Sequence, residues 1–295
     1  METKGSAPQI DDWGKKIARY YDETWIDYRS VWLNRGNLAM HMGYYDENTK
    51  SHAQSLVNTV RVMADRVGIG AGDRVFDAGC GVGGPAFWLA KERGAQVVGV
   101  TLSSAQVERA TRYAKERGLE SQVEFHQRDF RDTGFPAESF DVVFACESVG
   151  HTRDQTEFYR EANRLLKPGG RLIIRDGYKK REPVSDEEKK LVDHWFDAWV
   201  VPELPTIGQA IAGLEEAGFE QVAAEDISAN VIPSGKRLYF MCRVCEPLSA
   251  VLTKVRVRTP IQHSNLTGSI AGWRGHLKGL WQGCHVRARK PLAEG

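Results

Sequence analysis

Apolar runs alternate with amphipathic segments along the middle of the chain. The runs occupy residues 74–76, 96–100, 123–125, 140–145 and 171–175. Between them, segments such as residues 104–117 repeat apolar side chains at helical spacing, and Gly118 closes that segment. Runs that are apolar throughout are typical of strands buried on both faces, and strands that alternate with helices form parallel sheets. The pattern predicts an α/β core.

The regions on either side of this core have a different texture. Residues 12–66 are rich in aromatic side chains and mainly helical in pattern. A helix at 206–217 and a strand at 221–227 continue the alternation, residues 228–280 interrupt it, and a last strand is expected at 283–288. We therefore predict a Rossmann-like, doubly wound and mainly parallel sheet of seven strands, with helical N-terminal and C-terminal lid insertions.

The same pattern predicts the domain organisation. Residues 1–66 form a helical N-terminal cap, and residues 67–227 form the core, which includes a lid helix at about 177–205. Residues 228–280 form a lid or substrate insertion, and residues 281–295 form the final strand and tail. The apolar residues between 191 and 199 fall on one helical face, which indicates either a wall of a binding site or ordinary packing.

A glycine-rich segment, DAGCGVGG at 77–84, follows the first predicted strand and leads into a helix. Glycines at the end of a strand let a ligand approach the backbone closely, and the helix N-terminus offers unpaired N–H groups. A dinucleotide is one candidate ligand, because Gly79, Gly81 and Gly84 have the G-x-G-x-x-G spacing. Asp77 favours another ligand, since a carboxylate at this place suits a cationic amino group better than a pyrophosphate.

Four segments carry a family resemblance: DAGCGVGG at 77–84, RDF at 128–130, FDVVFACES at 140–148 and LLKPGGRL at 165–172. With this set in this order, the chain resembles the class I S-adenosylmethionine-dependent methyltransferases. The segment VTLSSAQ at 100–106 is similar to the branch that contains sterol, tocopherol, cyclopropane-fatty-acid and geranyl diphosphate methyltransferases. The resemblance implies S-adenosylmethionine as the cofactor and S-adenosylhomocysteine as its product.

The resemblance also implies which residues bind the cofactor. The glycines would line its methionine half, Asp129 would accept a hydrogen bond from the adenine amine, and Phe130 would supply an apolar surface. Many relatives carry an acidic residue after the second strand to hold the ribose, but residues 99–106 contain none. Thr101 and Gln106 are the expected substitutes. The expected cofactor-binding residues are therefore Asp77, Gly79, Gly81, Gly83, Thr101, Gln106, Asp129 and Phe130.

Glu147 and His151 follow the fourth predicted strand, where ligands bind in doubly wound sheets. They are four residues apart, so a helical turn would place them on one face. A carboxylate beside an imidazole suits general-base catalysis, and Glu147 could also stabilise positive charge on the acceptor. The alternative interpretation is that Glu147 caps a backbone group and His151 lies on the surface.

Aromatic residues outside the core suggest how an acceptor is bound. An alkene carbon that accepts a methyl group becomes a carbocation, which aromatic faces and a carboxylate stabilise before a base removes a proton. The segments MHMGYYD at 40–46 and GLWQGCHVRARKP at 279–291 resemble terpenoid-type C-methyltransferases of the same branch, which include geranyl diphosphate and prenylated-indole enzymes. The expected substrate-binding residues are Tyr21, Tyr45, Trp195, Trp199 and Trp273.

These observations predict C-methylation of a prenyl or terpenoid alkene in secondary metabolism, with or without a coupled cyclisation. The alternatives are an O- or N-methyltransferase of a natural product or small amine, and a cofactor-binding scaffold without turnover. A diphosphate substrate would require cations and Mg²⁺, although runs of basic residues are more often solvated surface. The basic residues available for it are Lys179, Lys180, Arg181, Lys254, Arg256 and Arg258.

The composition of the chain bears on which classes of partner the protein can bind. The net charge of +1 gives no field that would attract nucleic acid, and the apolar runs are too short to span a bilayer. The N-terminal segment lacks the apolar region of a secretory signal, so the expected location is the cytoplasm. Aromatic N-terminal helices that pack across subunits would make the protein a homo-oligomer.

The five cysteines do not form a recognisable framework. Their odd number and scattered positions argue against a set of disulfide bonds. Cys242 and Cys245 form a single C-x-x-C, and a metal site would need Cys284 and His285 as the second pair. The simpler interpretation is that the cysteines are small, buried apolar side chains, so no metal site is expected.

Overall fold

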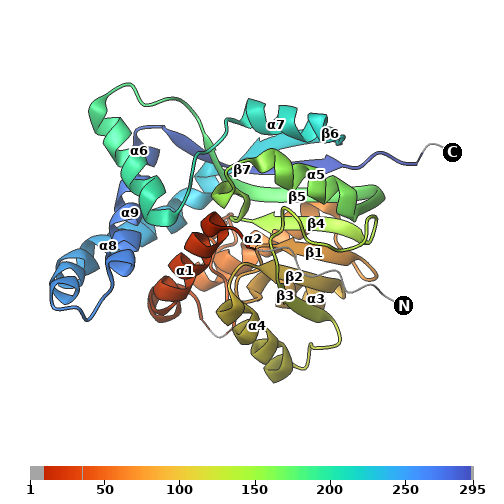
Figure 1. Cartoon of the computed structure of the whole chain (residues 1–295), viewed down its shortest axis with the longest axis horizontal. Helices are drawn as coiled ribbons and strands as arrows, with labels where there is room; N and C mark the ends of the chain where they lie inside the picture. The colour runs from red at the N-terminus through yellow and green to blue at the C-terminus, as the bar shows by residue number, and fades with distance from the viewer. Residues whose placement is uncertain (1–9, 35, 294–295) are drawn as a thin grey trace.

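The structure, a computed structural model, describes residues 10–34 and 36–293, so the first residues of the predicted cap and the last two of the tail lie outside it. Its centre is a seven-stranded sheet in the order β3-β2-β1-β4-β5-β7-β6 (Figure 1). The strands from β3 to β5 are parallel, and β7 runs antiparallel to both β5 and β6. The predicted Rossmann-like fold is confirmed. The strands are β1 (Arg74–Ala78), β2 (Gln96–Thr101), β3 (Val123–Gln127), β4 (Phe140–Cys146), β5 (Leu166–Lys179), β6 (Glu220–Asp226) and β7 (Trp281–Arg289).

Successive residues of a strand point to opposite sides of the sheet, and helices cover both sides. Phe76 packs toward α5 (Gln155–Leu165) and α7 (Ile207–Glu216). Val75 packs toward α2 (His52–Val67), α3 (Gly84–Arg93) and α4 (Ser104–Arg117). Both residues are fully buried. This two-sided burial explains why the central strands are apolar throughout.

Local signals set the helix ends. The Ser103 hydroxyl accepts a hydrogen bond from the Gln106 backbone N–H at the start of α4, and Gly118 ends that helix at a φ of 66°. The predicted helix at 104–117 is confirmed. β5 is longer than the predicted strand at 171–175, because Leu166 pairs with Phe140 before the register shifts and Lys179 still pairs with Trp281.

The remaining helices gather beyond the carboxyl ends of the parallel strands, at the left and centre of Figure 1. They are α1 (Asp12–Asp27), the π-helix η1 (Tyr28–Trp32), the 3₁₀ helix η2 (Val149–His151), α6 (Asp186–Trp199), α8 (Ser228–Lys254) and α9 (Pro260–Leu277). α6 packs on α9 through Trp195 and Ala271, and α8 packs on α9 through Cys242 and Ile270. In the described part of the chain, no helix is both long and apolar enough to cross a bilayer.

The aromatic residues of the N-terminal helices are covered within the chain itself. Tyr20 of α1 packs with Ile17 and Val200, and Trp32 of η1 packs with Ala39 and Leu56. Both aromatic side chains are less than 8% exposed. The homo-oligomer was predicted because these aromatic residues were expected to pack across subunits, and these two side chains pack within the chain instead. The oligomeric state itself stays a prediction.

Candidate active site

A cavity of about 730 Å³ lies beyond the carboxyl ends of β1, β2, β4 and β5. The glycine-rich turn and the ends of these strands form one half of its wall, and side chains of α1, η1, α6, α8 and α9 form the other half. We refer to these as the cofactor half and the acceptor half. This location follows the rule for ligands of doubly wound sheets.

The glycine turn leaves the cofactor half open to a ligand. Gly79 has a φ of 82°, and a Cβ atom there would lie 2.4 Å from Cβ of Ser148. Gly81 also lines the cavity, and a Cβ atom there would lie 3.3 Å from Sδ of Met40. Any larger side chain at these positions would therefore clash with its neighbours or fill the space that a ligand needs.

Two residues expected to bind the cofactor do not line the cavity. Gly83 caps α3, and a Cβ atom there would lie 2.8 Å from the rings of both Phe87 and Phe125, so this glycine serves close packing. Asp77 lies behind the turn, only 1% exposed. Its Oδ2 has no hydrogen-bond partner among the described residues, and burial raises its pKa to about 7.

The residues present fit S-adenosylmethionine. A cationic amino group beside the glycine turn would supply the missing partner of the Asp77 carboxylate and stabilise its charged form. At the end of β2, Thr101 and Gln106 both line the cavity, and the Thr101 hydroxyl donates to Oε1 of Gln106 over 2.5 Å. These two neutral side chains are therefore available for hydroxyl groups of the ligand.

An ion-pair network surrounds Asp129, the residue expected to bind the adenine of the cofactor. Nη2 of Arg131 lies 2.6 Å from Oδ2 of Asp129, and Arg131 also pairs with Asp11 and Glu157. Both Asp129 oxygens already accept hydrogen bonds from Arg131, so an adenine amine would have to share or replace one of these bonds. Phe130 lines the cavity beside it and contacts Phe158 edge to face.

Helix α1 lies across both halves. Asp11, its N-cap, contacts Arg131, and Asp22 accepts a hydrogen bond from the Ser103 hydroxyl over 2.5 Å. Near the start of the helix, Nε1 of Trp13 donates to the backbone oxygen of His151 over 2.8 Å. These bonds tie the helix to the strand ends, so α1 closes the cavity.

Glu147 lies at the end of β4 with a φ of 54°. Its Oε2 accepts a hydrogen bond from the Met42 backbone N–H over 3.0 Å, and its Oε1 forms an ion pair with the buried guanidinium of Arg175. The carboxylate thus contacts a backbone group, as the alternative interpretation held, and still lines the cavity with 27% of its side chain exposed. These contacts fix its orientation.

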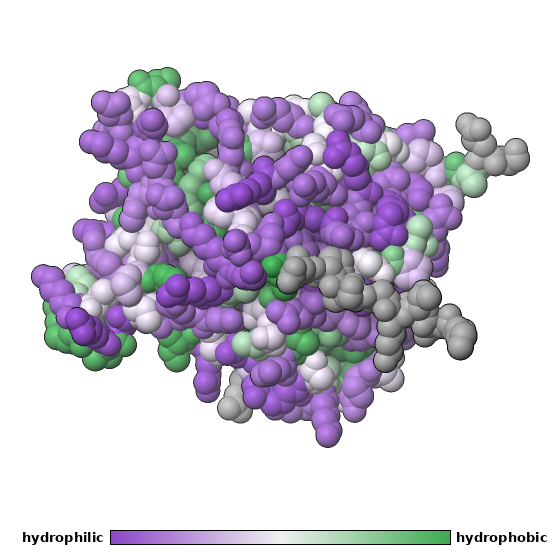
Figure 2. Space-filling model, in the orientation of Figure 1, coloured by the Kyte–Doolittle hydropathy of each residue, from purple (hydrophilic) through white to green (hydrophobic). Residues whose placement is uncertain are grey.

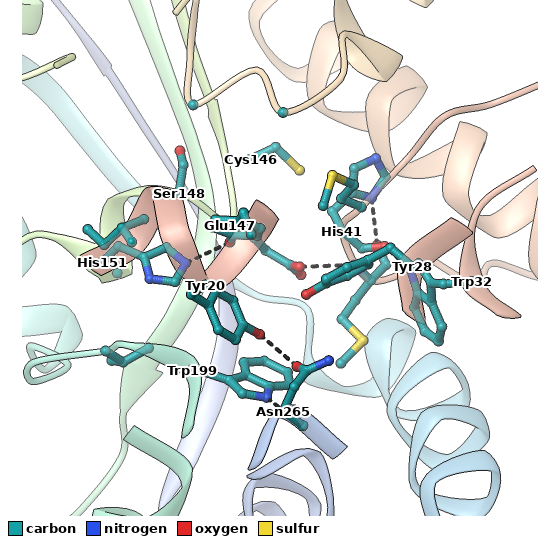
Figure 3. Close-up of a pocket in the computed structure, with 18 of the residues that line it drawn as sticks. Tyr20, Tyr28, Trp32, His41, Cys146, Glu147, Ser148, His151, Trp199 and Asn265 are labelled. Carbon is teal, nitrogen blue, oxygen red and sulfur yellow. Dashed lines mark hydrogen bonds between the residues drawn. The ribbon is translucent and has the colours of Figure 1, made fainter. Parts of the chain in front are cut away.

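His151 also lines the cavity, but it does not share a helical face with Glu147. The 3₁₀ helix begins only at Val149, and Figure 3 shows the two side chains directed to different parts of the cavity. Nδ1 of His151 lies 3.0 Å from the Val200 carbonyl oxygen, and Nε2 lies 2.8 Å from the Tyr21 hydroxyl. Because a carbonyl only accepts, Nδ1 carries the proton and Nε2 accepts from Tyr21. Burial lowers the pKa of His151, so the imidazole is neutral near pH 7.

The sequence analysis missed a second buried carboxylate in this region. Asp176 lines the cavity and accepts hydrogen bonds from the backbone N–H groups of Gly150 and Gly177, over 2.9 and 2.8 Å. Burial raises its pKa, and the hydrogen bonds from the Gly150 and Gly177 N–H groups oppose that rise. Asp176 directly follows the apolar run at 171–175, and this position was the signal that could have identified it.

Aromatic rings form much of the acceptor half. Of the expected residues, Tyr21, Trp195 and Trp199 line the cavity, whereas Tyr45 and Trp273 do not. The backbone of Tyr45 is paired with Asn230, and Trp273 packs instead against Tyr239 and His276. The aromatic lining residues that the sequence analysis did not select are Trp13, Tyr20, Tyr28, Trp32, Phe240 and Trp281.

The cations of the cavity wall are already neutralised. Those that line it in the described part of the chain are Arg131, Arg175 and Arg258, and each has a carboxylate partner. Among the six basic residues considered for a diphosphate, only Arg258 lines the cavity, and its Nη2 lies 2.8 Å from Oδ1 of Asp27. Within residues 10–34 and 36–293, no group of three or more His, Cys, Asp or Glu residues is arranged to hold a metal ion.

Sequence comparison places this geometry in a family. Residues 76–174 match the methyltransferase domain family. The methyltransferase GfsG of Streptomyces halstedii is 31% identical over 228 residues, which are 77% of this chain and 80% of that protein. A sterol 24-C-methyltransferase of Gibberella zeae is 35% identical over 213 residues, which are 70% of this chain and 55% of that protein.

Solved structures agree with the fold. The cyclase SpnF superposes with a TM-score of 0.78 at 25% identity, covering 98% of this chain and 100% of the other. A geranyl diphosphate C-methyltransferase of Streptomyces coelicolor, in complex with Mg²⁺, geranyl diphosphate and S-adenosylhomocysteine, has a TM-score of 0.71 at 19% identity and covers 96% of this chain and 100% of the other.

The chain belongs to the class I S-adenosylmethionine-dependent methyltransferases, in the branch that includes the sterol 24-C-methyltransferases. It is an enzyme whose cofactor is S-adenosylmethionine.

Proposed function

We propose that the enzyme methylates a carbon of a neutral prenyl or terpenoid alkene. The observation that carries this proposal is the Glu147 carboxylate, held in place by Arg175 and by the Met42 N–H inside a cavity with many aromatic rings. The sterol and geranyl diphosphate C-methyltransferases among its relatives support the choice of carbon as the methylated atom.

The arrangement suits a cationic intermediate. S-adenosylmethionine, when bound, supplies an electrophilic methyl group. An alkene that accepts this group becomes a carbocation, and the rings of Tyr20, Tyr28 and Trp199 supply negative faces for it. The Glu147 carboxylate adds a preorganised negative group, which costs no reorganisation during the reaction.

Tyr21 and His151 complete the reaction by removing a proton. The C–H bond next to the cationic carbon breaks, and its electron pair forms the new double bond. The proton passes to the Tyr21 oxygen while the Tyr21 hydroxyl proton moves to Nε2 of His151, along the 2.8 Å hydrogen bond. The Val200 carbonyl keeps the other proton on Nδ1, so Nε2 is the basic nitrogen.

The paired cations of the wall define the acceptor further. A diphosphate would have to displace Asp129, Glu147 or Asp27 from its arginine, which would leave a buried charge without a partner. The proposed acceptor therefore carries no diphosphate, and the proposal includes no magnesium.

One observation favours a second candidate function. The neutral His151 imidazole could take a proton from a hydroxyl or amine through the Tyr21 hydroxyl, which would make the enzyme an O- or N-methyltransferase of a natural product. The cofactor half of the cavity would be the same for both reactions.

Product analysis separates the two functions. The enzyme is incubated with S-adenosylmethionine labelled in the methyl group and with prenylated indoles, terpenoid alkenes and matched alcohols and amines. NMR then assigns the labelled methyl group. A new C–CH₃ group supports the proposal, a methyl group on oxygen or nitrogen supports the second candidate, and cofactor binding without any product supports a scaffold.

Glu147→Gln tests the role of the carboxylate. The amide oxygen can still accept the Met42 N–H, so we expect unchanged cofactor affinity in calorimetry and a fall in kcat of roughly a hundredfold or more. Glu203→Gln is the control, because Glu203 is exposed and pairs only with Lys179. Equal kcat in the two variants would remove Glu147 from the mechanism.

A further inference from the structure

Helix α8 has two apolar faces. One face, which includes Cys242, packs against Leu266 and Ile270 of α9. The other face carries large apolar side chains three and four positions apart, which places them in one line along the helix. We call this line the apolar strip. Its residues and exposures are Phe240 at 55%, Val244 at 79%, Leu248 at 62%, Val251 at 56% and Val255 at 61%.

The strip begins at the mouth of the cavity. Phe240 and Val244 line the cavity although more than half of each is exposed, and Ile26 of α1, 47% exposed, lies at the same opening. From there the strip follows α8 away from the sheet, and Figure 2 shows apolar surface over the far end of this helix, at the lower left. A contiguous apolar surface of this kind marks an interaction site.

The strip lies in a basic part of the chain. Residues 236–258 contain six lysines and arginines and one acidic residue, a net charge of +5, whereas the whole chain has +1. Arg243 pairs with Glu246, and Arg258 pairs with Asp27. The other four basic residues, Lys236, Arg237, Lys254 and Arg256, are exposed and have no ion-pair partner among the described residues.

We propose that α8 docks on the surface of an anionic lipid bilayer, with the apolar strip against the acyl chains and the four unpaired cations against the headgroups. An apolar helix face beside a set of cations is the combination that binds such surfaces. A second copy docked through the same strip would bring like charges together, which disfavours it. The sequence analysis expected no membrane partner from the length of the apolar runs, but that criterion concerns membrane spans and not surface contact.

This docking deepens the proposed function and rests on it in one respect. The mouth between Ile26, Phe240 and Val244 would face the bilayer, so a neutral terpenoid dissolved in the membrane could reach the cavity without crossing water. The contact with lipid itself does not depend on which atom is methylated.

Vesicle co-sedimentation of the whole chain tests the docking. We expect binding to phosphatidylcholine vesicles that contain phosphatidylglycerol, much weaker binding to phosphatidylcholine alone, and loss of binding at high salt. The double variant Leu248→Ser/Val251→Ser should bind roughly tenfold more weakly, and Lys254→Glu about fivefold more weakly. Val184→Ser is the matched control, since Val184 is 82% exposed but lies outside α8.

Equal binding by all variants, or no binding to anionic vesicles, would overturn the docking. A concentration-dependent dimer that the double variant dissociates, without vesicle binding, would assign the strip to a second copy and overturn it as well. Leu248 and Val251 do not line the cavity, so turnover of a dissolved acceptor should be unchanged in the double variant. Turnover without vesicle binding therefore rejects only the docking, and vesicle binding without turnover rejects only the proposed function.

Discussion

The two halves of the cavity are neighbours in space but are built in different ways. The cofactor half consists of strand ends and bare backbone, and Gly79, Thr101 and Asp129 each lie at or just after the end of a strand that is fixed by the core. The acceptor half consists of side chains from lid helices whose sequence positions range from Trp13 to Ser269.

This difference follows from the tasks of the two halves. The cofactor half needs empty space close to a rigid sheet, and only a few residue types provide it. The acceptor half needs a shape that matches one substrate, and lid helices can change this shape without altering the core. The following variants test whether the two halves are as separate as the structure indicates.

The largest expected effect comes from Gly79→Ala. Its Cβ atom would lie 2.4 Å from Cβ of Ser148, at a φ of 82° that disfavours any side chain. Overpacking and backbone strain together predict a loss of cofactor affinity of roughly a thousandfold. Gly72→Ala is the matched control, because its φ is 89° but nothing lies within 4 Å of the added atom. Calorimetry with S-adenosylmethionine should separate the two variants, and similar affinities would show that the turn does not form the cofactor half.

The sequence identified the cofactor half because its signals are local. DAGCGVGG combines a strand end, glycines and an acidic residue within a few positions, and the alternation of apolar runs and amphipathic segments placed it in a parallel sheet. Two residues of the same segment do not line the cavity. Gly83 packs against Phe87 and Phe125, and Asp77 is buried behind the turn, because sequence spacing does not distinguish which side of a turn faces a cavity.

The acceptor half could not be predicted to the same extent. Tyr21 was selected from the sequence and Tyr20 was not, yet both line the cavity, whereas Tyr45 lies outside it. Their positions depend on how α1, η1 and α9 pack against each other over long sequence separations, as the bond between the Tyr20 hydroxyl and Asn265 illustrates. Helical periodicity identifies a buried face but does not say what it is buried against.

The next largest effect concerns the ion pair of Arg175 and Glu147. Arg175→Met should lower the free energy of unfolding by about 3–5 kcal/mol, because it leaves the Glu147 carboxylate without its cation in a buried site. The double variant Arg175→Met/Glu147→Met should recover much of this loss. Urea denaturation of both single variants and the double variant measures the coupling. Additive changes would contradict a buried, mutually dependent pair.

The pH dependence of kcat should show a smaller effect that belongs to the acceptor half alone. Because burial lowers the pKa of His151 from its ordinary value of 6.5, the imidazole gains a proton at lower pH than a free histidine does. We expect kcat to be nearly constant from pH 8 to 7 and to fall as the pH drops through the lowered pKa, while cofactor affinity changes little. His151→Gln should lower kcat by roughly a hundredfold and remove the acidic decline. His194→Gln, at an exposed histidine bonded to Thr267, should change neither.

The smallest expected effect comes from two tryptophans on neighbouring lid helices. Trp199 of α6 lines the cavity and donates from Nε1 to the Asn265 backbone oxygen over 3.2 Å, whereas Trp273 of α9 lies outside the cavity. Trp199→Leu removes apolar surface from the acceptor and should raise its KM roughly tenfold, with the affinity for S-adenosylmethionine unchanged. Trp273→Leu should leave both constants within about twofold of the wild type. An equal rise of KM in the two variants would show that the lid helices respond as one packed unit. A lower affinity for S-adenosylmethionine in Trp199→Leu would show that the two halves are energetically coupled and that their separation is only geometric.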